Sequence, residues 1–144
     1  MDIDPRIEGR EQVLKLILEA ISRARKLLAE ILVDESKIRK IELIWRIYFD
    51  VEFSVGLGRF LVRNANAFVG KYRKVVVSKK NDLLSMPLAQ LKERIRAIDS
   101  ELECALYDFE TSPSERGLEF GRKARDELKM LILGSTKAPG KIKD

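Results

Sequence analysis

The side chains best suited to chemistry in this sequence are basic and aromatic ones that alternate through the middle of the chain. Residues 53 to 81 contain seven Lys and Arg residues and no Asp or Glu. Seven of the ten aromatic residues lie between residues 45 and 72, so the two types overlap. Lys and Arg neutralise phosphates, and exposed rings stack on bases with little preference for sequence. This combination is typical of a site for single-stranded nucleic acid.

Ten residues from this region form the candidate nucleic-acid-binding set. The cations would contact phosphates, and the rings would stack on bases. The set consists of Arg46, Tyr48, Arg59, Phe60, Arg63, Phe68, Lys71, Tyr72, Arg73 and Lys74. Asp50 and Glu52 would share a strand face with Tyr48 and repel phosphate, so a site that includes Tyr48 must leave them beyond its edge.

Few residues are suited to catalysis. The chain has no histidine, which removes the commonest general base and the commonest metal ligand. Cys104 is the single cysteine, and we expect it to be a small, partly buried residue. A zinc site would need several Cys or His ligands. We therefore expect no enzyme activity, no metal and no cofactor.

A cluster of acidic residues in the second half of the chain is the remaining candidate for a metal site. We interpret it as a helix surface that forms salt bridges with Lys and Arg. Its members are Glu101, Glu103, Asp108 and Glu110.

The spacing of the hydrophobic residues changes along the chain. Residues 10 to 33 have apolar side chains at helical spacing in one wide stripe, which predicts a long helix covered on two sides. Every odd position from 43 to 55 is apolar, and most of these residues are β-branched or aromatic. The alternation predicts a strand that buries Trp45, Phe49 and Phe53. The competing interpretation is a helix with the stripe Ile41, Ile44, Tyr48 and Val51.

Glycines follow this predicted strand. Gly56-Leu57-Gly58 would form a hairpin turn or a bulge, and it lacks the residues of a phosphate-binding loop. Residues 59 to 69 fit either a return strand or a helix, and residues 75 to 77 are three valines that predict a further strand. We favour an antiparallel meander over this region.

Two helices are predicted in the second half of the chain. The first would be capped by Ser85, with Pro87 in its first turn. The second would begin where Ser112 and Glu115 have capping-box spacing, and it would run to Gly134 as its C-cap.

Strands grouped between helices favour the α+β class. We predict a small antiparallel β-sheet packed against amphipathic helices, in the order helix, strands, helix, helix. The length of 144 residues fits one domain, which we place at residues 1 to 134. Residues 135 to 144 are expected to be a disordered basic tail.

The sequence indicates a cytoplasmic protein. Its N-terminus lacks the basic start and the apolar run of a signal peptide. No stretch reaches the roughly 18 consecutive apolar residues of a membrane span. One cysteine permits no disulfide within the chain. The abundance of Ile, Leu and Val together with Lys, Arg and Glu is common in hyperthermophile proteins.

The overall pattern resembles the ThermoDBP family of single-stranded DNA-binding proteins and its related archaeal proteins. The matching features are the aromatic stretch of residues 45 to 53, GLGRF and AFVGKYRK, set between amphipathic helices. The resemblance implies binding of single-stranded DNA, in preference to RNA, in a cleft of aromatic and basic side chains, and it implies a homo-oligomer. Some relatives dimerise through a C-terminal leucine zipper. The short last helix predicted here would require another surface.

Two alternative functions stay open. The apolar stripes of residues 13 to 32 and 88 to 109 would suit a helical oligomerisation or adaptor protein. An RNA-binding factor would share the phosphate chemistry of a DNA-binding protein. All three hypotheses describe binding without catalysis.

Overall fold

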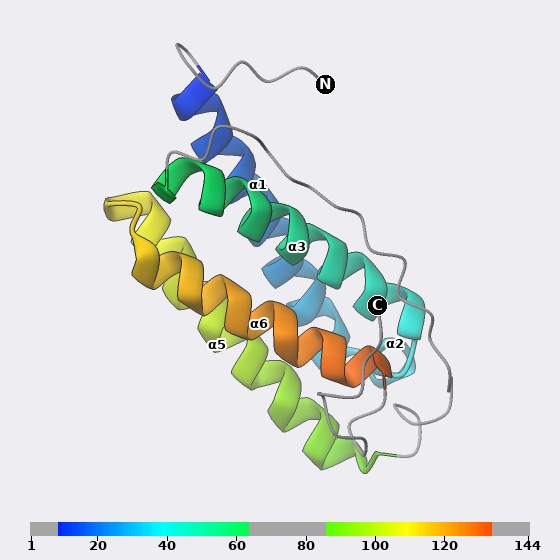
Figure 1. Ribbon diagram of the computed structural model, residues 1–144. Helices are drawn as coiled ribbons and strands as arrows, with labels where there is room; N and C mark the ends of the chain where they lie inside the picture. Colours follow the sequence, from blue (N-terminus) through cyan, green and yellow to red (C-terminus); the bar gives the residue numbers. More distant parts are fainter. Residues whose placement is uncertain (1–8, 64–85, 134–144) are drawn as a thin grey trace.

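A computed structural model describes residues 9–63 and 86–133, and within these ranges the regular structure is entirely helical (Figure 1). The helices are α1 (Gly9–Val33), α2 (Glu35–Ile38), α3 (Ile41–Arg63), α5 (Leu88–Thr111) and α6 (Glu115–Leu133). The α+β prediction is therefore wrong for the described part of the chain, where no strand occurs. The predicted helix over residues 10 to 33 is confirmed. The valines at 75 to 77 and the tail at 135 to 144 lie outside the described residues.

The four long helices form a bundle in which each packs most extensively against two others. Helix α1 packs against α3 and α5, and α6 packs against the same two helices (Figure 1). Between α1 and α3, Arg10 contacts the carbonyl of Leu61 and Arg23 contacts Asp50, so these two helices run antiparallel. Between α3 and α6, Arg63 pairs with Glu115 and Arg125 with Glu52, so these two also run antiparallel. The core between the helices is aliphatic, and its largest fully buried side chains include Ile17, Leu28, Ile44, Ile47, Leu91, Ile95 and Leu102.

The segment predicted as a strand is the first half of α3. Its alternation of apolar residues comes from two series at four-residue spacing, Leu43/Ile47/Val51/Val55 and Trp45/Phe49/Phe53. A shift of two residues turns a helix by about 200°, so the two series lie on nearly opposite faces. Ile47, Val51 and Val55 are buried, whereas Phe49 and Phe53 are exposed. The competing helical interpretation was the correct one, because Ile44, Tyr48 and Val51 are buried.

Glycine in the middle of α3 permits a close helix contact and makes no turn. A Cβ atom on Gly58 would lie 2.9 Å from Cζ of Phe109, which belongs to α5. The absence of a side chain therefore lets the Phe109 ring approach the backbone of α3. Residues 56 to 58 lie inside α3, so the predicted hairpin turn or bulge is wrong.

The connection between α5 and α6 is organised by one carboxylate. Asp108 accepts hydrogen bonds from the backbone N–H groups of Ser114 and Gly117, each at 3.0 Å, and from the Ser114 hydroxyl at 2.8 Å. The helix break predicted here is confirmed, but Asp108 and Ser114 replace the expected Ser112 cap. At the start of α5, Pro87 occupies the N-cap and is not in the first turn.

Candidate nucleic-acid interface

Three large rings lie along the solvent side of α3, and we call Trp45, Phe49 and Phe53 the α3 aromatic row. Phe49 and Phe53 are 38% and 37% exposed, and Trp45 is half-buried. The prediction that these are core residues is therefore wrong for Phe49 and Phe53, whereas Trp45 packs against the core. Residues four positions apart on a helix lie on the same face, so the three rings share one outer face of α3.

Two rings of the row pack together, and a buried tyrosine lies against both. Trp45 and Phe49 are stacked, with ring centroids 5.3 Å apart and planes inclined by 24°. The Tyr48 ring meets Trp45 edge-on at 5.8 Å and Phe49 at 5.7 Å. These are the offset and edge-to-face arrangements that aromatic pairs favour. The cluster thus fixes two rings of the row relative to each other.

Tyr48 is itself held by a charged group. Its hydroxyl donates a 2.9 Å hydrogen bond to Oε2 of Glu52. Burial raises the pKa of Tyr48 above its usual value, and the neighbouring charge of Glu52 raises it further. Tyr48 is only 6% exposed, so a base cannot stack on its ring. Its expected role in the candidate set is therefore not possible in this structure.

The other described members of the candidate set are spread along α3. Arg46 and Arg59 are exposed, and neither forms an ion pair within the described residues. They are thirteen positions apart, which separates them by about 20 Å along the axis and by about 140° around it. Phe60 is half-buried against the core.

Arg63 is exposed but already has an anionic partner. It donates from Nε and Nη2 to Glu115 of α6 at 3.0 and 2.9 Å. This contact raises the pKa of Arg63 and lowers the pKa of Glu115. A phosphate would have to compete with that carboxylate. The remaining candidates, Phe68, Lys71, Tyr72, Arg73 and Lys74, lie outside the described residues.

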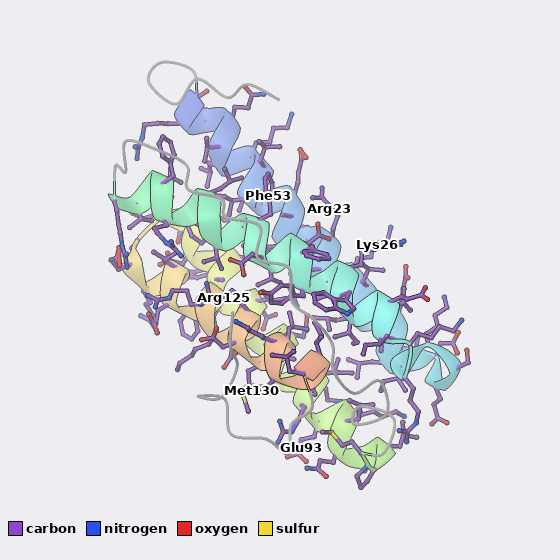
Figure 2. The ribbon with its side chains drawn as sticks, turned by 45° about the vertical axis from the view of Figure 1, so that its right-hand side comes forward. Arg23, Lys26, Phe53, Glu93, Arg125 and Met130 are labelled. Atoms are coloured by element: carbon purple, nitrogen blue, oxygen red, sulfur yellow. The ribbon has the colours of Figure 1, made fainter. Side chains whose placement is uncertain are left out.

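The carboxylates beside the row are paired with cations from neighbouring helices. Arg23 of α1 reaches Asp50 at 3.3 Å, and Arg125 of α6 lies 3.7 Å from Glu52. Arg23 projects from α1 on the side where Phe53 projects from α3 (Figure 2). These pairs reduce the repulsion that Asp50 and Glu52 would exert on a phosphate. Arg23 and Arg125 could not be identified from the sequence, because their partners are distant in the chain.

Three acidic residues of α5 have structural partners: Asp99 and Glu103 pair with Arg25, and Asp108 holds the connection to α6. Arg25 of α1 binds Asp99 at 3.0 Å and Glu103 at 3.5 Å, and these contacts raise its pKa despite the opposing effect of burial. Within residues 9–63 and 86–133 no group of three or more potential ligands could hold a metal ion. Cys104 is exposed, contrary to expectation.

Glu101 is the acidic residue for which we expect a measurable pH effect. Its Oε2 atom is buried without a hydrogen-bond partner. Burial raises the pKa of Glu101 and the charge of Glu127 raises it further, while Lys123 opposes both. A carboxyl whose pKa is raised by folding stabilises the fold below its unfolded pKa. That contribution is lost as pH rises through the folded pKa.

Glu101→Gln should therefore be more stable than the wild type at neutral pH by about 0.5 kcal/mol. The difference should vanish below about pH 4, where the carboxyl is protonated in both states. Thermal denaturation at the two pH values measures this. Glu103→Gln, which removes one of the two partners of Arg25, is the control and should not stabilise. A larger gain for Glu101→Gln at acid pH would contradict the argument.

No protein-family model, curated protein or solved structure matches this chain. The resemblance to the ThermoDBP family thus stays a prediction. No helix among the described residues is long and apolar enough to span a membrane.

Proposed function

We propose that this protein binds single-stranded nucleic acid, with DNA as the favoured polymer, through the α3 aromatic row. The observation that carries the proposal is the exposure of large rings at four-residue spacing on one helix face. Each ring that stacks on a base contributes about 1–3 kcal/mol to binding. Arg46 and Arg59 are the cations of α3 that remain available to phosphates.

The spacing of the row favours a single strand over a duplex. Four residues of helix advance by about 6 Å. Successive bases within a duplex strand are only about 3.4 Å apart. Bases could therefore engage both Phe53 and the stacked Trp45–Phe49 pair only after they separate from one another, which a single strand permits at low cost. Stacking on rings also explains why little sequence preference is expected.

A protein partner is the competing occupant, because aromatic rings also form the centres of protein interfaces. Two observations favour nucleic acid. The row ends at Phe53, where the acid-free stretch of the sequence begins, and the whole chain has a net charge of +5. The nearest carboxylates, Asp50 and Glu52, are also partly neutralised by Arg23 and Arg125.

The test is a titration of the protein into labelled oligothymidylate, the matching RNA strand and a DNA duplex, at several salt concentrations. We expect the single strands to bind more tightly than the duplex. Arg46 and Arg59 would make two phosphate contacts. A plot of log affinity against log salt concentration should therefore have a slope of about −1.4 or steeper. The comparison of DNA with RNA decides the polymer.

Two results would contradict the proposal. Equal affinity for duplex and single strand would exclude base stacking as the basis of binding. If no strand binds and light scattering shows a dimer that Phe53→Ala dissociates, the row is an interface between protein chains.

A further inference from the structure

A chain of polar contacts links α6 to the underside of the α3 aromatic row. Arg125 projects from α6 towards α3 (Figure 2), and its Nη1 lies 3.7 Å from Oε1 of Glu52. The other oxygen of Glu52 accepts the hydrogen bond from Tyr48. The Tyr48 ring in turn packs edge-on against Trp45 and Phe49. One continuous set of contacts therefore runs from α6 to the stacked pair.

We infer that Arg125, acting through Glu52 and Tyr48, sets the orientation of the stacked Trp45–Phe49 pair. Tyr48 is then a positioning residue: its ring is buried, whereas the pair that it supports consists of the half-buried Trp45 and the exposed Phe49. The expected effect on ligand affinity rests on the proposed function, whereas the expected effect on the motion of the Trp45 ring does not.

The contacts have the properties that such a role requires. The Arg125 side chain is only 18% exposed, and Asp126 holds its other edge at 3.0 Å. A second carboxylate thus holds the guanidinium while it lies beside Glu52. The hydrogen bond from Tyr48 is to a charged acceptor, which makes it stronger than a bond between neutral groups. Fixing the hydroxyl fixes the rotation of the ring, and the ring edges fix their aromatic neighbours.

A purely structural role for Tyr48 makes a different prediction. If only its bulk matters, phenylalanine should replace it without consequence, since the ring and its packing are retained. If the hydroxyl matters, Tyr48→Phe should release Trp45 although the helix bundle stays folded. The distinction can be measured because Trp45 is the only tryptophan in the chain.

The experiment compares Tyr48→Phe, Glu52→Gln and Arg125→Gln in the full-length protein. Time-resolved fluorescence anisotropy should show faster and wider motion of Trp45 in Tyr48→Phe and Arg125→Gln. Glu52→Gln removes the charge that attracts Arg125 and weakens the acceptor for the tyrosine, so it should release Trp45 as Arg125→Gln does. For Tyr48→Phe, the affinity for oligothymidylate should fall about threefold to tenfold, because the released rings must be ordered again when the strand binds.

Arg25→Gln is the matched control, because it breaks a part-buried ion pair between α1 and α5 that does not contact the aromatic cluster. It should leave Trp45 motion unchanged. Wild-type Trp45 motion in both Tyr48→Phe and Arg125→Gln would overturn the inference. If the wild-type protein binds no strand, the proposed function fails by itself, and the anisotropy of the variants still decides whether Tyr48 positions the row.

Discussion

Replacing Phe49 and Phe53 together with alanine is expected to weaken the binding of oligothymidylate by at least about 30-fold. Two stacking rings are lost, and each contributes about 1–3 kcal/mol. Both rings are more than one-third exposed. The cost to stability should therefore be about 1 kcal/mol per site, well below that of a core truncation. Fluorescence polarisation with a labelled strand measures the affinity, and circular dichroism confirms the fold.

Tyr107→Ala is the control for this double variant. Tyr107 is an aromatic residue on α5 that is 69% exposed, and it belongs to no part of the row. Its removal should leave the affinity unchanged. A double variant that binds as tightly as the wild type would show that the strand binds elsewhere on the protein.

The largest expected loss of stability comes from Gly117→Ala. An added Cβ would collide with the carboxylate of Asp108. That carboxylate accepts hydrogen bonds from Gly117 and Ser114, so its displacement exposes two backbone N–H groups at the start of α6. Loss of a helix cap costs about 0.5–2 kcal/mol, and overpacking costs about 1–3 kcal/mol. We expect the free energy of unfolding to fall by about 2–4 kcal/mol.

Urea denaturation followed by circular dichroism measures this loss. Gly121→Ala, within the same helix, is the matched control, because its added Cβ would meet only Cγ2 of Val55, at 3.3 Å. A small shift of the valine relieves that contact. If the two variants unfold at the same urea concentration, the carboxylate of Asp108 does not organise the connection between α5 and α6.

Helix α1 could be predicted from the sequence, whereas α3 could not. In α1 the apolar residues fall in a single stripe, which only a helix can bury on one side. In α3 a second apolar series, Trp45/Phe49/Phe53, lies opposite the buried one. The two series together reproduce the alternation of a strand. Exposed aromatic residues thus caused the error, and they are also the residues of functional interest.

The packing roles of the glycines in α3 and α6 could not be identified from the sequence, for a related reason. Gly58 is explained by the ring of Phe109, which lies 51 residues further along the chain. Gly117 is explained by the carboxylate of Asp108. Neither partner can be identified from local sequence, because a glycine that permits a close contact has the same appearance as one that makes a turn.

Five of the ten candidate residues lie on α3, and the other five lie outside the described residues. Within α3 the predicted assignment of buried and exposed rings was reversed. Tyr48 is buried, and Phe49 and Phe53 are exposed. Ion pairs from α1 and α6 to Asp50 and Glu52 could not be foreseen, because they depend on how three helices pack.

The most direct measurement of the central claim is the emission of Trp45 during a titration with unlabelled oligothymidylate. Trp45 is the only tryptophan and belongs to the row, so a base that stacks there must change its fluorescence. We predict saturable quenching that added salt reverses and that Phe49→Ala/Phe53→Ala weakens. Binding of a labelled strand with unchanged Trp45 emission would contradict the claim that single strands occupy the α3 aromatic row.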